Sequence, residues 1–314
     1  MAAAPAPLTK GLVMTADPTG QRFLLHGPRS SAEITQVGAA LRALTVDGVD
    51  LVPSYPDDQP TPAASGVVLV PWPNRIRDGK YTFEGEELQL AISEPKFGNA
   101  SHGLLRFGTY QPIEHTDERL VLGADVVPQT GYPFHLRTRV TYTLLPDGVD
   151  VAHHIENVGA RTAPVALGVH PYLQIGGVVT ADLVIRSTGT TTLVLDDRNI
   201  PVDEVPVDER TDLRGGRRLG DASLDNGYRG LERDADGRAV HTLTAPDGRT
   251  LRLWQDAGFG WAQVFTTDRY PGQPLAVAIE PMTAPANAFA SGIDVLAVTP
   301  GMSLTREWGI RFSA

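Results

Sequence analysis

The chain has 314 residues, of which 41% are hydrophobic and 20% are charged, as is typical of a globular protein. Its net charge of −10 argues against nucleic-acid binding, because the phosphates would be repelled, and the lack of cysteine excludes disulfides, a thiol nucleophile and a thiolate metal site. The first 20 residues lack the basic start and apolar run of a signal peptide, and no apolar stretch is long enough to cross a membrane. We therefore expect a cytoplasmic protein that binds neither nucleic acid nor a membrane.

Strands and tight turns are the main pattern along the chain. Segments such as "ALTVDGVDLV" and "HTLTAPDGRTLRLW" place an Asp-Gly pair between alternating apolar runs, which predicts hairpins because both residues tolerate positive φ. Sustained helical periodicity is not evident, and the 32 glycines and 25 prolines favour turns. We expect an all-β protein, an antiparallel sandwich or barrel, with one domain over residues 1–314 and about the first 25 residues peripheral. The Asp-Gly pairs are Asp47-Gly48, Asp78-Gly79, Asp147-Gly148, Asp236-Gly237 and Asp247-Gly248.

Two long loops are predicted. Residues 53–66, "PSYPDDQPTPAASG", are polar and rich in proline, and we call this segment the Pro-rich loop. Residues 196–227 are longer, charged and poor in aromatic residues. A loop of that length in a compact domain is usually functional or disordered, so we expect it to lie over the surface and to bring Asp225 to a specific place.

Two turn-rich segments in the first third of the chain carry polar groups. They are "PWPNRIRDGKY", with Asn74 and Arg75, and "NASHGLLRFG", with His102 and Arg106. A single histidine in such a turn is more often a surface or capping residue than a catalyst, so His102 by itself leaves both interpretations open.

The segment "VALGVHPYL" predicts a strand that ends on a histidine. Period-two alternation places Val165, Leu167 and Val169 on one face of the strand. The other face carries the small residues Ala166 and Gly168, followed by His170. Pro171 favours an extended backbone at the histidine. The small residues suggest an opened face beside an imidazole that could act as an acid or a base.

The segment "LAVAIEPM", residues 275–282, repeats this pattern with a carboxylate. Leu275, Val277 and Ile279 form the expected core face, and Ala276, Ala278 and Glu280 the other. An unpaired buried carboxylate is costly, so Glu280 needs water, a partner or a ligand. The two alanines predict open space beside it, where a small ligand could meet both Glu280 and His170.

Several chemistries can be weighed against this pattern. A metal site has little support, because no pair of histidines has the spacing of a zinc-binding helix and the adjacent His153 and His154 would point to opposite faces of a strand. Asp225 and Glu280 could form a glycosidase pair, but their separation cannot be read from the sequence. Acid–base opening of a cyclic sugar needs only one acid and one base, and it requires no cofactor.

At these residues the chain resembles the aldose 1-epimerase (galactose mutarotase) family over about residues 30–312. The resemblance implies a large antiparallel β-sandwich, the galactose mutarotase-like supersandwich, with the sugar in an open cleft on one sheet and no cofactor. The motifs that carry it, in order along the chain, are "PWPNRIRDGKYTFEG", "HGLLRFGTY", "LGVHPYL", "LDNGYRGL" and "IEPMTAPANAFASG".

The resemblance also implies roles for single residues. Glu280 matches the family's general base, which takes the anomeric proton, and His170 matches the general acid, which protonates the ring oxygen. His102 matches the histidine that assists near the ring oxygen. Arg75 and Asp225 match residues that contact sugar hydroxyls. From the same motifs we assign Asn74 and Tyr172 to substrate binding.

The sequence leaves the substrate open. Leu104 follows Gly103 where the best-studied members have a second glycine. The leading prediction is an isomerase that interconverts the α and β anomers of a free aldohexose, as a monomer or homodimer. The alternatives are a carbohydrate-binding module without catalysis, an epimerase of a hexose 6-phosphate, for which Arg106 would contribute to the phosphate pocket, and a carbohydrate hydrolase or lyase.

Overall fold

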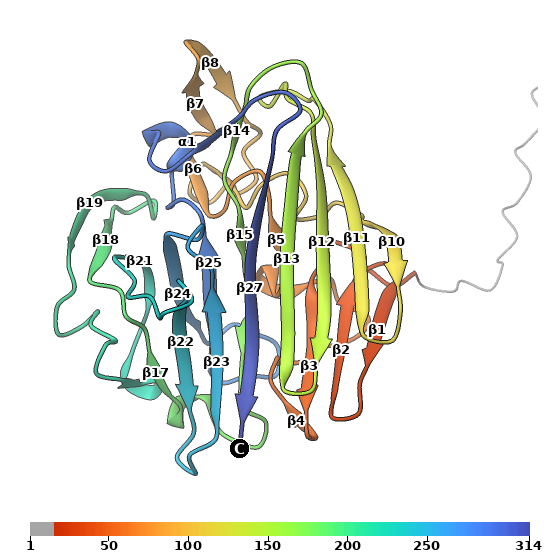
Figure 1. Ribbon diagram of the computed structural model, residues 1–314. Helices are drawn as coiled ribbons and strands as arrows, with labels where there is room; N and C mark the ends of the chain where they lie inside the picture. Colours follow the sequence, from red (N-terminus) through yellow and green to blue (C-terminus); the bar gives the residue numbers. More distant parts are fainter. Residues whose placement is uncertain (1–15) are drawn as a thin grey trace, which may run out of the picture.

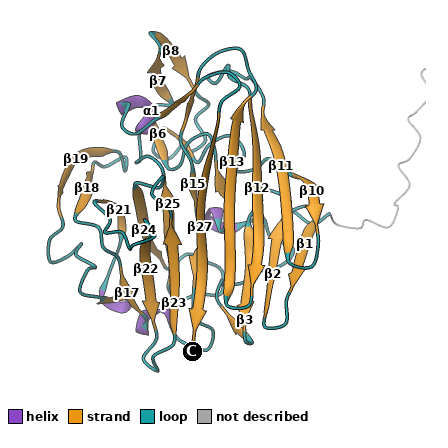
Figure 2. Cartoon of the chain, viewed as in Figure 1, coloured by secondary structure: helices purple, strands orange, loops and turns teal. Residues whose placement is uncertain are grey.

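The computed structural model describes residues 16–314, and it consists almost entirely of antiparallel strands joined by turns (Figures 1 and 2). This confirms the predicted all-β class and antiparallel sandwich. The helical elements are limited to a few short turns. They are η1 (Pro62–Ala64), η2 (Thr180–Asp182), η3 (Leu219–Asp221) and α1 (Ala288–Ser291).

The largest sheet has nine strands and forms the front layer of Figure 1. Its middle strand, β27, pairs with β13 on one side and with β23 on the other, so segments about 150 positions apart in the chain meet there. In spatial order the strands are β10 (Gln111–His115), β11 (Arg119–Val126), β12 (Leu136–Leu145), β13 (Gly148–Asn157), β27 (Ser303–Ser313), β23 (Thr250–Gln255), β22 (Ala239–Thr244), β17 (Val184–Arg186) and β20 (Arg217–Arg218).

Two further sheets form the second layer, behind the first in Figure 1. The eight-stranded sheet contains β19 (Pro201–Pro206), β18 (Thr191–Leu195), β21 (Asp225–Arg229), β24 (Trp261–Thr267), β25 (Ala276–Met282), β15 (Gly168–Val169) and β5 (Val68–Leu69) in that order, with β16 (Tyr172–Leu173) paired to β25. The four-stranded sheet contains β1 (Arg22–His26), β2 (Ser30–Thr35), β3 (Leu41–Val46) and β4 (Val49–Asp50).

Three two-stranded ladders complete the fold. They are β14 (Ala163–Val165) with β26 (Leu296–Val298), β6 (Arg75–Arg77) with β9 (Asn99–Ser101), and β7 (Lys80–Phe83) with β8 (Glu86–Gln89). The β6–β9 ladder carries the paired residues Arg75 and Ser101 to the outer face of the eight-stranded sheet.

The main core lies between the two layers. Val140 and Val151 of the nine-stranded sheet belong to the same buried cluster as Ile34 and Leu44 of the four-stranded sheet and Ile279 of β25. Successive side chains of a strand point to opposite faces, so burying Ile279 on this side turns its neighbours in β25 to the outer face of the eight-stranded sheet. That outer face is where the candidate site lies.

Asp-Gly turns form the three predicted hairpins β3–β4, β12–β13 and β22–β23. The pairs Asp78-Gly79 and Asp236-Gly237 also lie in turns, but the strands on either side of them do not pair with each other, so the hairpin prediction was wrong there. Asp47 and Gly48, between β3 and β4, both have positive φ (50° and 77°), and Asp78 and Gly79, between β6 and β7, repeat this (54° and 64°). Such turns match the right-handed twist of the strands that they join. They keep the strands short and in a fixed register.

The segment 196–227 is not one long loop, as the sequence pattern suggested. It contains the edge strand β19, the short strand β20 and the turn η3 before β21 begins at Asp225. An edge strand that is exposed on both faces shows no apolar alternation, so its sequence looks like a loop. Its hairpin with β18 extends the eight-stranded sheet and leads the chain to Asp225.

The N-terminal part of the chain was expected to be peripheral over about 25 residues. Residues 1–15 lie outside the described part. Phe23 and Leu25 of β1 are buried in the main core, so the chain is integrated into the fold from β1 onward.

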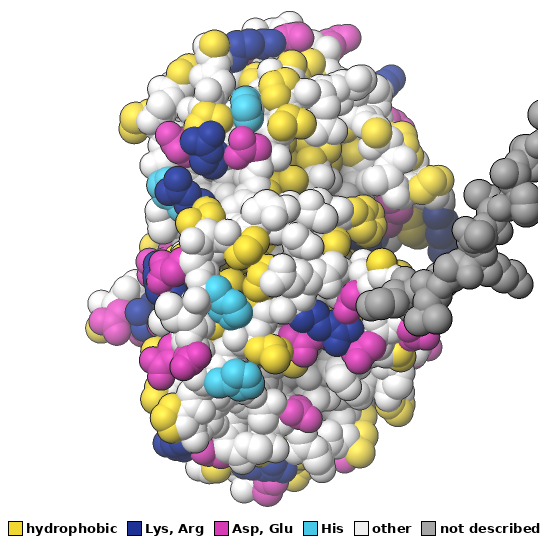
Figure 3. Space-filling view, turned by 90° about the vertical axis from the view of Figure 1, so that its right-hand side faces the viewer, with side chains coloured by type: hydrophobic (Ala, Val, Ile, Leu, Met, Phe, Trp, Pro, Cys, Tyr) yellow, Lys and Arg dark blue, Asp and Glu magenta, His cyan; other side chains and the backbone are white. Residues whose placement is uncertain are grey.

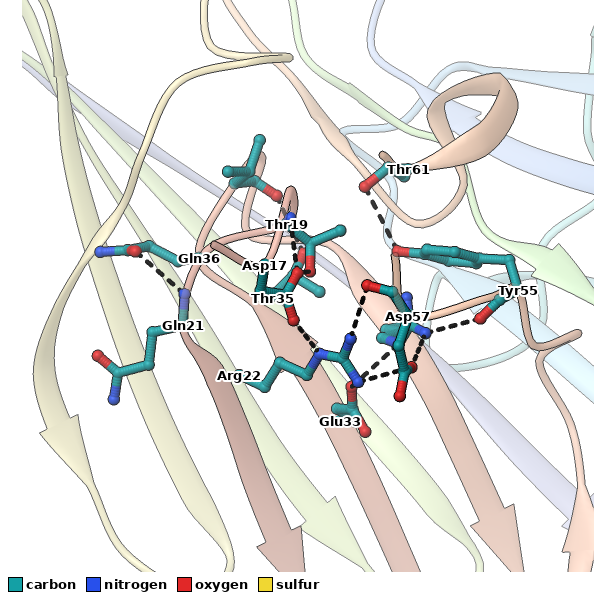
Figure 4. Close-up of polar contacts among 12 residues, drawn as sticks. Asp17, Thr19, Gln21, Arg22, Glu33, Thr35, Gln36, Tyr55, Asp57 and Thr61 are labelled. Carbon is teal, nitrogen blue, oxygen red and sulfur yellow. Dashed lines mark hydrogen bonds and ion pairs between the residues drawn. The ribbon is translucent and has the colours of Figure 1, made fainter. Parts of the chain in front are cut away.

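A cluster of ion pairs fastens the Pro-rich loop to the four-stranded sheet (Figure 4). Asp57 of the loop receives hydrogen bonds from Arg22 (2.8 Å) and from the buried Arg42 (2.7 Å). Arg42 also donates to the Tyr55 carbonyl oxygen (2.7 Å) and contacts Glu33 (3.0 Å). Ion pairs at the surface contribute little to stability. We therefore assign the anchoring to Arg42, whose loss would leave the buried Tyr55 carbonyl without its hydrogen-bond donor.

Charged side chains of both signs are interspersed over the face of the molecule that Figure 3 presents. No helix in the described part of the chain combines the length and apolar character that crossing a bilayer requires.

Candidate active site

All seven residues that the sequence analysis assigned to the site line one pocket on the outer face of the eight-stranded sheet. The pocket has a volume of about 440 Å³, within the range of about 300–1,000 Å³ usual for small-molecule sites. A cavity of about 500 Å³ beside β7 and β8 has no histidine in its lining. The pocket is lined by Ala63, Asn74, Arg75, Ser93, Glu94, Pro95, Lys96, Ser101, His102, Arg106, His170, Tyr172, Asp225, Gln263, Phe265 and Glu280.

Glu280 reaches the pocket because β25 alternates as the sequence predicts. Ile279 belongs to the main core, and Glu280 points to the opposite face, where it is only 2% exposed. The prediction of open space beside Ala276 and Ala278 was wrong, because Tyr172 and Tyr270 pack against both alanines. The small side chains make room for these aromatic rings, and Tyr172 lines the pocket next to the carboxylate.

His170 follows β15 and is 6% exposed. The expectation that small residues clear its face was also wrong. Ala166 lies in the main core, and a Cβ at Gly168 would come within 2.6 Å of Pro73, so the glycine permits close packing instead of opening a cavity. The histidine is fixed by its backbone, which accepts a hydrogen bond from the N–H of Gly66 (2.8 Å).

Glu280 and His170 face each other across the pocket wall, with 3.3 Å between Oε1 and Nε2. Burial raises the pKa of the Glu280 carboxyl well above its usual 4.5; the negative charge of Asp225 adds to the shift, and Arg75 offsets part of it. Burial lowers the pKa of His170 from 6.5 to about 3, and the positive charges of Arg106 and Arg75 act in the same direction. A single proton on the pair therefore favours the carboxyl group over the imidazole.

The ring of His170 is held between two other rings. It stacks on Tyr172 with a centroid distance of 5.2 Å and an interplanar angle of 21°, and it meets His102 edge to face at 5.6 Å. Burial lowers the pKa of His102 well below its usual 6.5, and the charges of His170, Arg106 and Arg75 add to this. Two neutral imidazoles therefore lie side by side.

The turn that carries His102 requires the glycine after it. His102 and Gly103 have φ values of 63° and 73°, in the left-handed region. The His102 N–H donates to the Asn74 carbonyl (2.9 Å), and the Leu104 N–H donates to the Val70 carbonyl (2.8 Å). A Cβ on Gly103 would lie 2.2 Å from the Val70 oxygen, so this position admits only glycine without a shift of the backbone.

Arg75 is already paired. Its Nε and one Nη donate to the two carboxylate oxygens of Glu94, at 2.9 and 3.0 Å. Asn99 also donates to Glu94 (3.3 Å), and the Asn74 side-chain oxygen accepts the Arg75 N–H (2.9 Å). This bidentate pair fixes the plane of the guanidinium, so the arginine presents its remaining nitrogen to the pocket in a defined direction.

Asp225 and Gln263 form the opposite wall. The Gln263 amide donates to Asp225 Oδ1 (2.7 Å), and Gln263 lies directly across the β24–β25 ladder from Glu280. Gln263 thus orients one carboxylate while it lies beside the other. The remaining oxygen of Asp225 is left to meet a ligand hydroxyl.

Sequence reasoning missed Gln263, Glu94, Lys96 and Phe265. The signal for Gln263 was present, because Trp261, Gln263 and Phe265 alternate along "WAQVFTT" and place a polar amide on a face that is otherwise apolar. Lys96 and Glu94 lie in a segment without strand or helix periodicity, and no local pattern assigned them to the site.

Among residues 16–314, no group of three or more histidine, aspartate or glutamate side chains is arranged to hold a metal ion. The chemistry that the described residues offer on their own is proton transfer between a buried carboxyl group and a buried imidazole.

Comparison with known proteins shows which family the chain resembles as a whole. The family model described as aldose 1-epimerase matches residues 21–311. The uncharacterized protein YihR of Escherichia coli (strain K12) is 34% identical over 286 residues, which cover 90% of each chain. Galactose mutarotase of Rattus norvegicus is 28% identical over 201 residues, 59% of this chain and 55% of that protein.

Solved structures show the same fold. A GalM/aldose epimerase homologue from C. elegans has a TM-score of 0.81 at 19% identity, covering 93% of this chain and 98% of its own. The galactose 1-epimerase of Lactobacillus acidophilus NCFM has a TM-score of 0.77 at 18% identity, covering 92% and 93%. The predicted galactose mutarotase-like supersandwich is confirmed.

Proposed function

The chain belongs to the aldose 1-epimerase family, and from this premise we propose that it interconverts the α and β anomers of an aldohexose by acid–base opening and reclosure of the ring. The observation that carries the proposal is the facing pair of Glu280 and His170, 3.3 Å apart and nearly buried in the wall of a pocket of sugar size. A binding module would have no need for an acid and a base that face each other.

In the proposed reaction, Glu280 takes the proton of the anomeric hydroxyl while His170 gives a proton to the ring oxygen. The C1–O5 bond breaks, its electron pair stays on O5, and C1 becomes an aldehyde. Rotation about the C1–C2 bond exposes the other face of the carbonyl. O5 then attacks C1 and returns its proton to His170, and Glu280 returns its proton to O1. Atoms and charges balance without a cofactor.

The electrostatics of the pocket support this assignment. With the ring closed, the reactive pair is a carboxylate and an imidazolium; with the ring open, the same proton count gives a carboxylic acid and a neutral imidazole. Burial favours the second arrangement, as the raised pKa of Glu280 and the lowered pKa of His170 indicate. The carboxylate–imidazolium form is therefore the minor protonation state of the pair, and the two proton transfers of ring opening return the pair to its favoured neutral form.

The other predicted residues would hold the sugar. His102 lies beside His170 near the proposed position of the ring oxygen, and Arg75, Asn74 and Asp225 can direct polar atoms at hydroxyl groups. Tyr172 lines the pocket beside His170, on whose ring it stacks, and its hydroxyl is buried without a hydrogen-bond partner. The cytoplasmic location and the monomeric or homodimeric state stay predictions.

The test is the decay of optical rotation of freshly dissolved α-D-glucose and α-D-galactose, followed with wild-type protein and with Glu280→Gln. The substitution preserves shape but removes the base, so the catalysed rate should fall by about 10²–10⁴. Glu307→Gln, on the exposed side of β27, is the matched control and should be as active as wild type. Full turnover by Glu280→Gln would contradict the proposal. If wild type binds sugar and does not accelerate the decay, the protein is a binding module.

A further inference from the structure

Residues 94–99 form a tight turn at the edge of the pocket, and we call this segment the rim turn. Its two ends meet, because the Glu94 N–H donates to the Asn99 carbonyl (2.9 Å) in an isolated bridge. Glu94 lines the pocket and forms the bidentate pair with Arg75. The rim turn is therefore the segment that presents a carboxylate to the arginine.

The rim turn holds Arg75 from two sides. Besides the pair with Glu94, the ring of Phe97 lies against the guanidinium, with 5.8 Å between its centroid and Arg75 Cζ. Within the rim turn only Asn99 is buried. A segment with so little buried surface opens easily, so it needs contacts from outside to keep one shape.

Arg198 supplies such contacts from a distant part of the chain. It lies between β18 and β19, and its Nε donates to the Phe97 carbonyl (2.8 Å) while Nη2 donates to the Gly98 carbonyl (2.9 Å) and to Asp78 (2.8 Å). The Asn99 amide donates in return to the Arg198 carbonyl (3.0 Å). The arginine thus joins successive carbonyl groups of the rim turn to each other and to the body of the protein.

The backbone around Arg198 is itself fixed. Asp196 Oδ1 accepts the N–H groups of Arg198 (2.9 Å) and Ile200 (3.0 Å), and its other carboxylate oxygen pairs with Arg77 of β6. Since β6 begins at Arg75, both the strand that carries this arginine and the turn that orients its side chain are tied to the same loop, residues 196–200.

The Asp78 ion pair does not account for this arrangement. The Asp78 side chain is 51% exposed, and an ion pair with such a partner contributes little to stability. The hydrogen bonds to the rim turn are shaped more closely, because a Cβ on Gly98 would lie only 2.9 Å from Arg198 Nη2. Arg198 is not one of the described residues that line the pocket, so any effect on the reaction must pass through the rim turn.

We propose that Arg198 is a positioning residue of the reaction. It holds the rim turn in the shape in which Glu94 and Phe97 keep the guanidinium of Arg75 directed at the sugar. This inference rests on the proposed function, from which it takes the contact between Arg75 and a sugar hydroxyl. It gives the start of the segment 196–227 a role besides leading the chain to Asp225.

The experiment measures kcat and KM of wild type, Arg198→Met and Arg198→Lys by polarimetry with α-D-glucose and α-D-galactose. A hydrogen bond from a charged group contributes about tenfold or more to binding, and an Arg75 that is free to turn loses part of it, so Arg198→Met should raise KM by about three- to tenfold. The value of kcat should stay within about twofold, because a hydroxyl contact shared by ground state and transition state changes KM alone. Arg198→Lys keeps a donor and should raise KM less.

A double-mutant cycle with Arg75→Gln separates positioning from a general effect on the fold. If Arg198 acts through Arg75, then Arg198→Met should change kcat/KM of the Arg75→Gln enzyme by less than about twofold. A general weakening of the fold would lower kcat/KM by the same factor in both backgrounds. Arg210→Met is the matched control, because Arg210 is an exposed arginine of the segment 196–227 outside the described pocket lining, and it should leave kcat and KM unchanged.

Two outcomes would overturn the inference while the proposed function stands. One is a wild-type KM in an Arg198→Met protein that circular dichroism shows to be folded. The other is an equal loss of kcat/KM with and without the Arg75 side chain. If Arg198→Met does not fold, the same cycle with Arg198→Lys decides. A wild-type protein that accelerates neither sugar would instead overturn the proposed function, and the inference with it.

Discussion

The protonation state of the catalytic pair makes a sharp prediction about pH. The pair is competent when it holds one proton, as carboxylate with imidazolium or as carboxylic acid with imidazole. Lowering the pH adds a second proton, which must go to a histidine whose pKa burial has lowered to about 3. Raising the pH removes the single proton from Glu280, whose pKa is raised well above 4.5. Because the two groups are coupled, each apparent pKa in the pH profile of kcat/KM describes the Glu280–His170 pair and not one residue alone.

The size of the effect follows from the lowered pKa of His170. If the second proton bound with the ordinary histidine pKa of 6.5, kcat/KM for glucose at pH 5.5 would be about tenfold below its plateau. With a pKa of about 3, less than about 1% of the enzyme is doubly protonated at pH 5.5, so kcat/KM should show no decline between pH 7 and 5.5. Burial lowers the pKa of His102 in the same direction.

The assay is polarimetry of α-D-glucose between pH 5.5 and 8, at constant ionic strength and with the uncatalysed rate subtracted in each buffer. Glucose does not ionise in this range, so kcat/KM reports groups of the free enzyme. Far-UV circular dichroism at each pH ensures that a loss of rate is not a loss of fold. A tenfold decline between pH 7 and 5.5, with an apparent pKa near 6.5, would refute the assignment of a neutral buried His170.

Three substitutions test other parts of the structure. Tyr172→Phe removes a buried hydroxyl that has no hydrogen-bond partner, so the free energy of unfolding should rise by about 1–3 kcal/mol. A lower melting temperature of the variant in calorimetry would show that the hydroxyl has a partner. Gly103→Ala should cost about 1–3 kcal/mol of stability and reduce kcat/KM, because the new Cβ would lie 2.2 Å from a carbonyl oxygen. The control is Gly48→Ala, which has a similar φ and nothing within 4 Å of the new Cβ, and it should leave kcat/KM unchanged. Equal effects of the two substitutions on kcat/KM would contradict this account. Arg42→Met removes the buried cation that holds the Pro-rich loop and leaves the buried Tyr55 carbonyl without its donor, so urea unfolding should show a loss of about 1–3 kcal/mol. A loss under about 0.5 kcal/mol would mean that the surface partner Arg22 anchors the loop.

The sequence predicted the parts of the site that depend on local geometry. Alternation along one strand is enough to place Ile279 in the core and Glu280 on the opposite face. It could not reveal what covers that face, because Tyr172 comes from a segment about 100 positions earlier and reaches Ala278 only through the β16–β25 ladder. Small residues on one face of a strand predict that another group packs closely against that face. Tertiary packing decides whether that group is a ligand or a side chain of the protein.

Pairing between distant side chains was equally hidden. Arg75 was predicted to contact the ligand, and its bidentate partner Glu94 lies in an irregular segment with no periodicity. For Gln263 the position on the strand could be predicted from the alternation. Its role could not, because an amide by itself indicates no chemistry, and its partner Asp225 is identified only by the structure.

The position of β27 in the middle of the nine-stranded sheet has a consequence for synthesis of the chain. Both of its neighbours, β13 and β23, are made before it, and each presents a bare row of N–H and C=O groups until residues 303–313 arrive. Bare edges of this kind recruit other strands and promote aggregation. During translation, the edges of β13 and β23 therefore stay unpaired until β27 is synthesised, and the nascent chain must avoid pairing these edges with each other or with other chains. A nascent chain of this protein should need chaperone protection until late in translation, and a premature stop before residue 303 should leave an aggregate rather than a smaller folded protein.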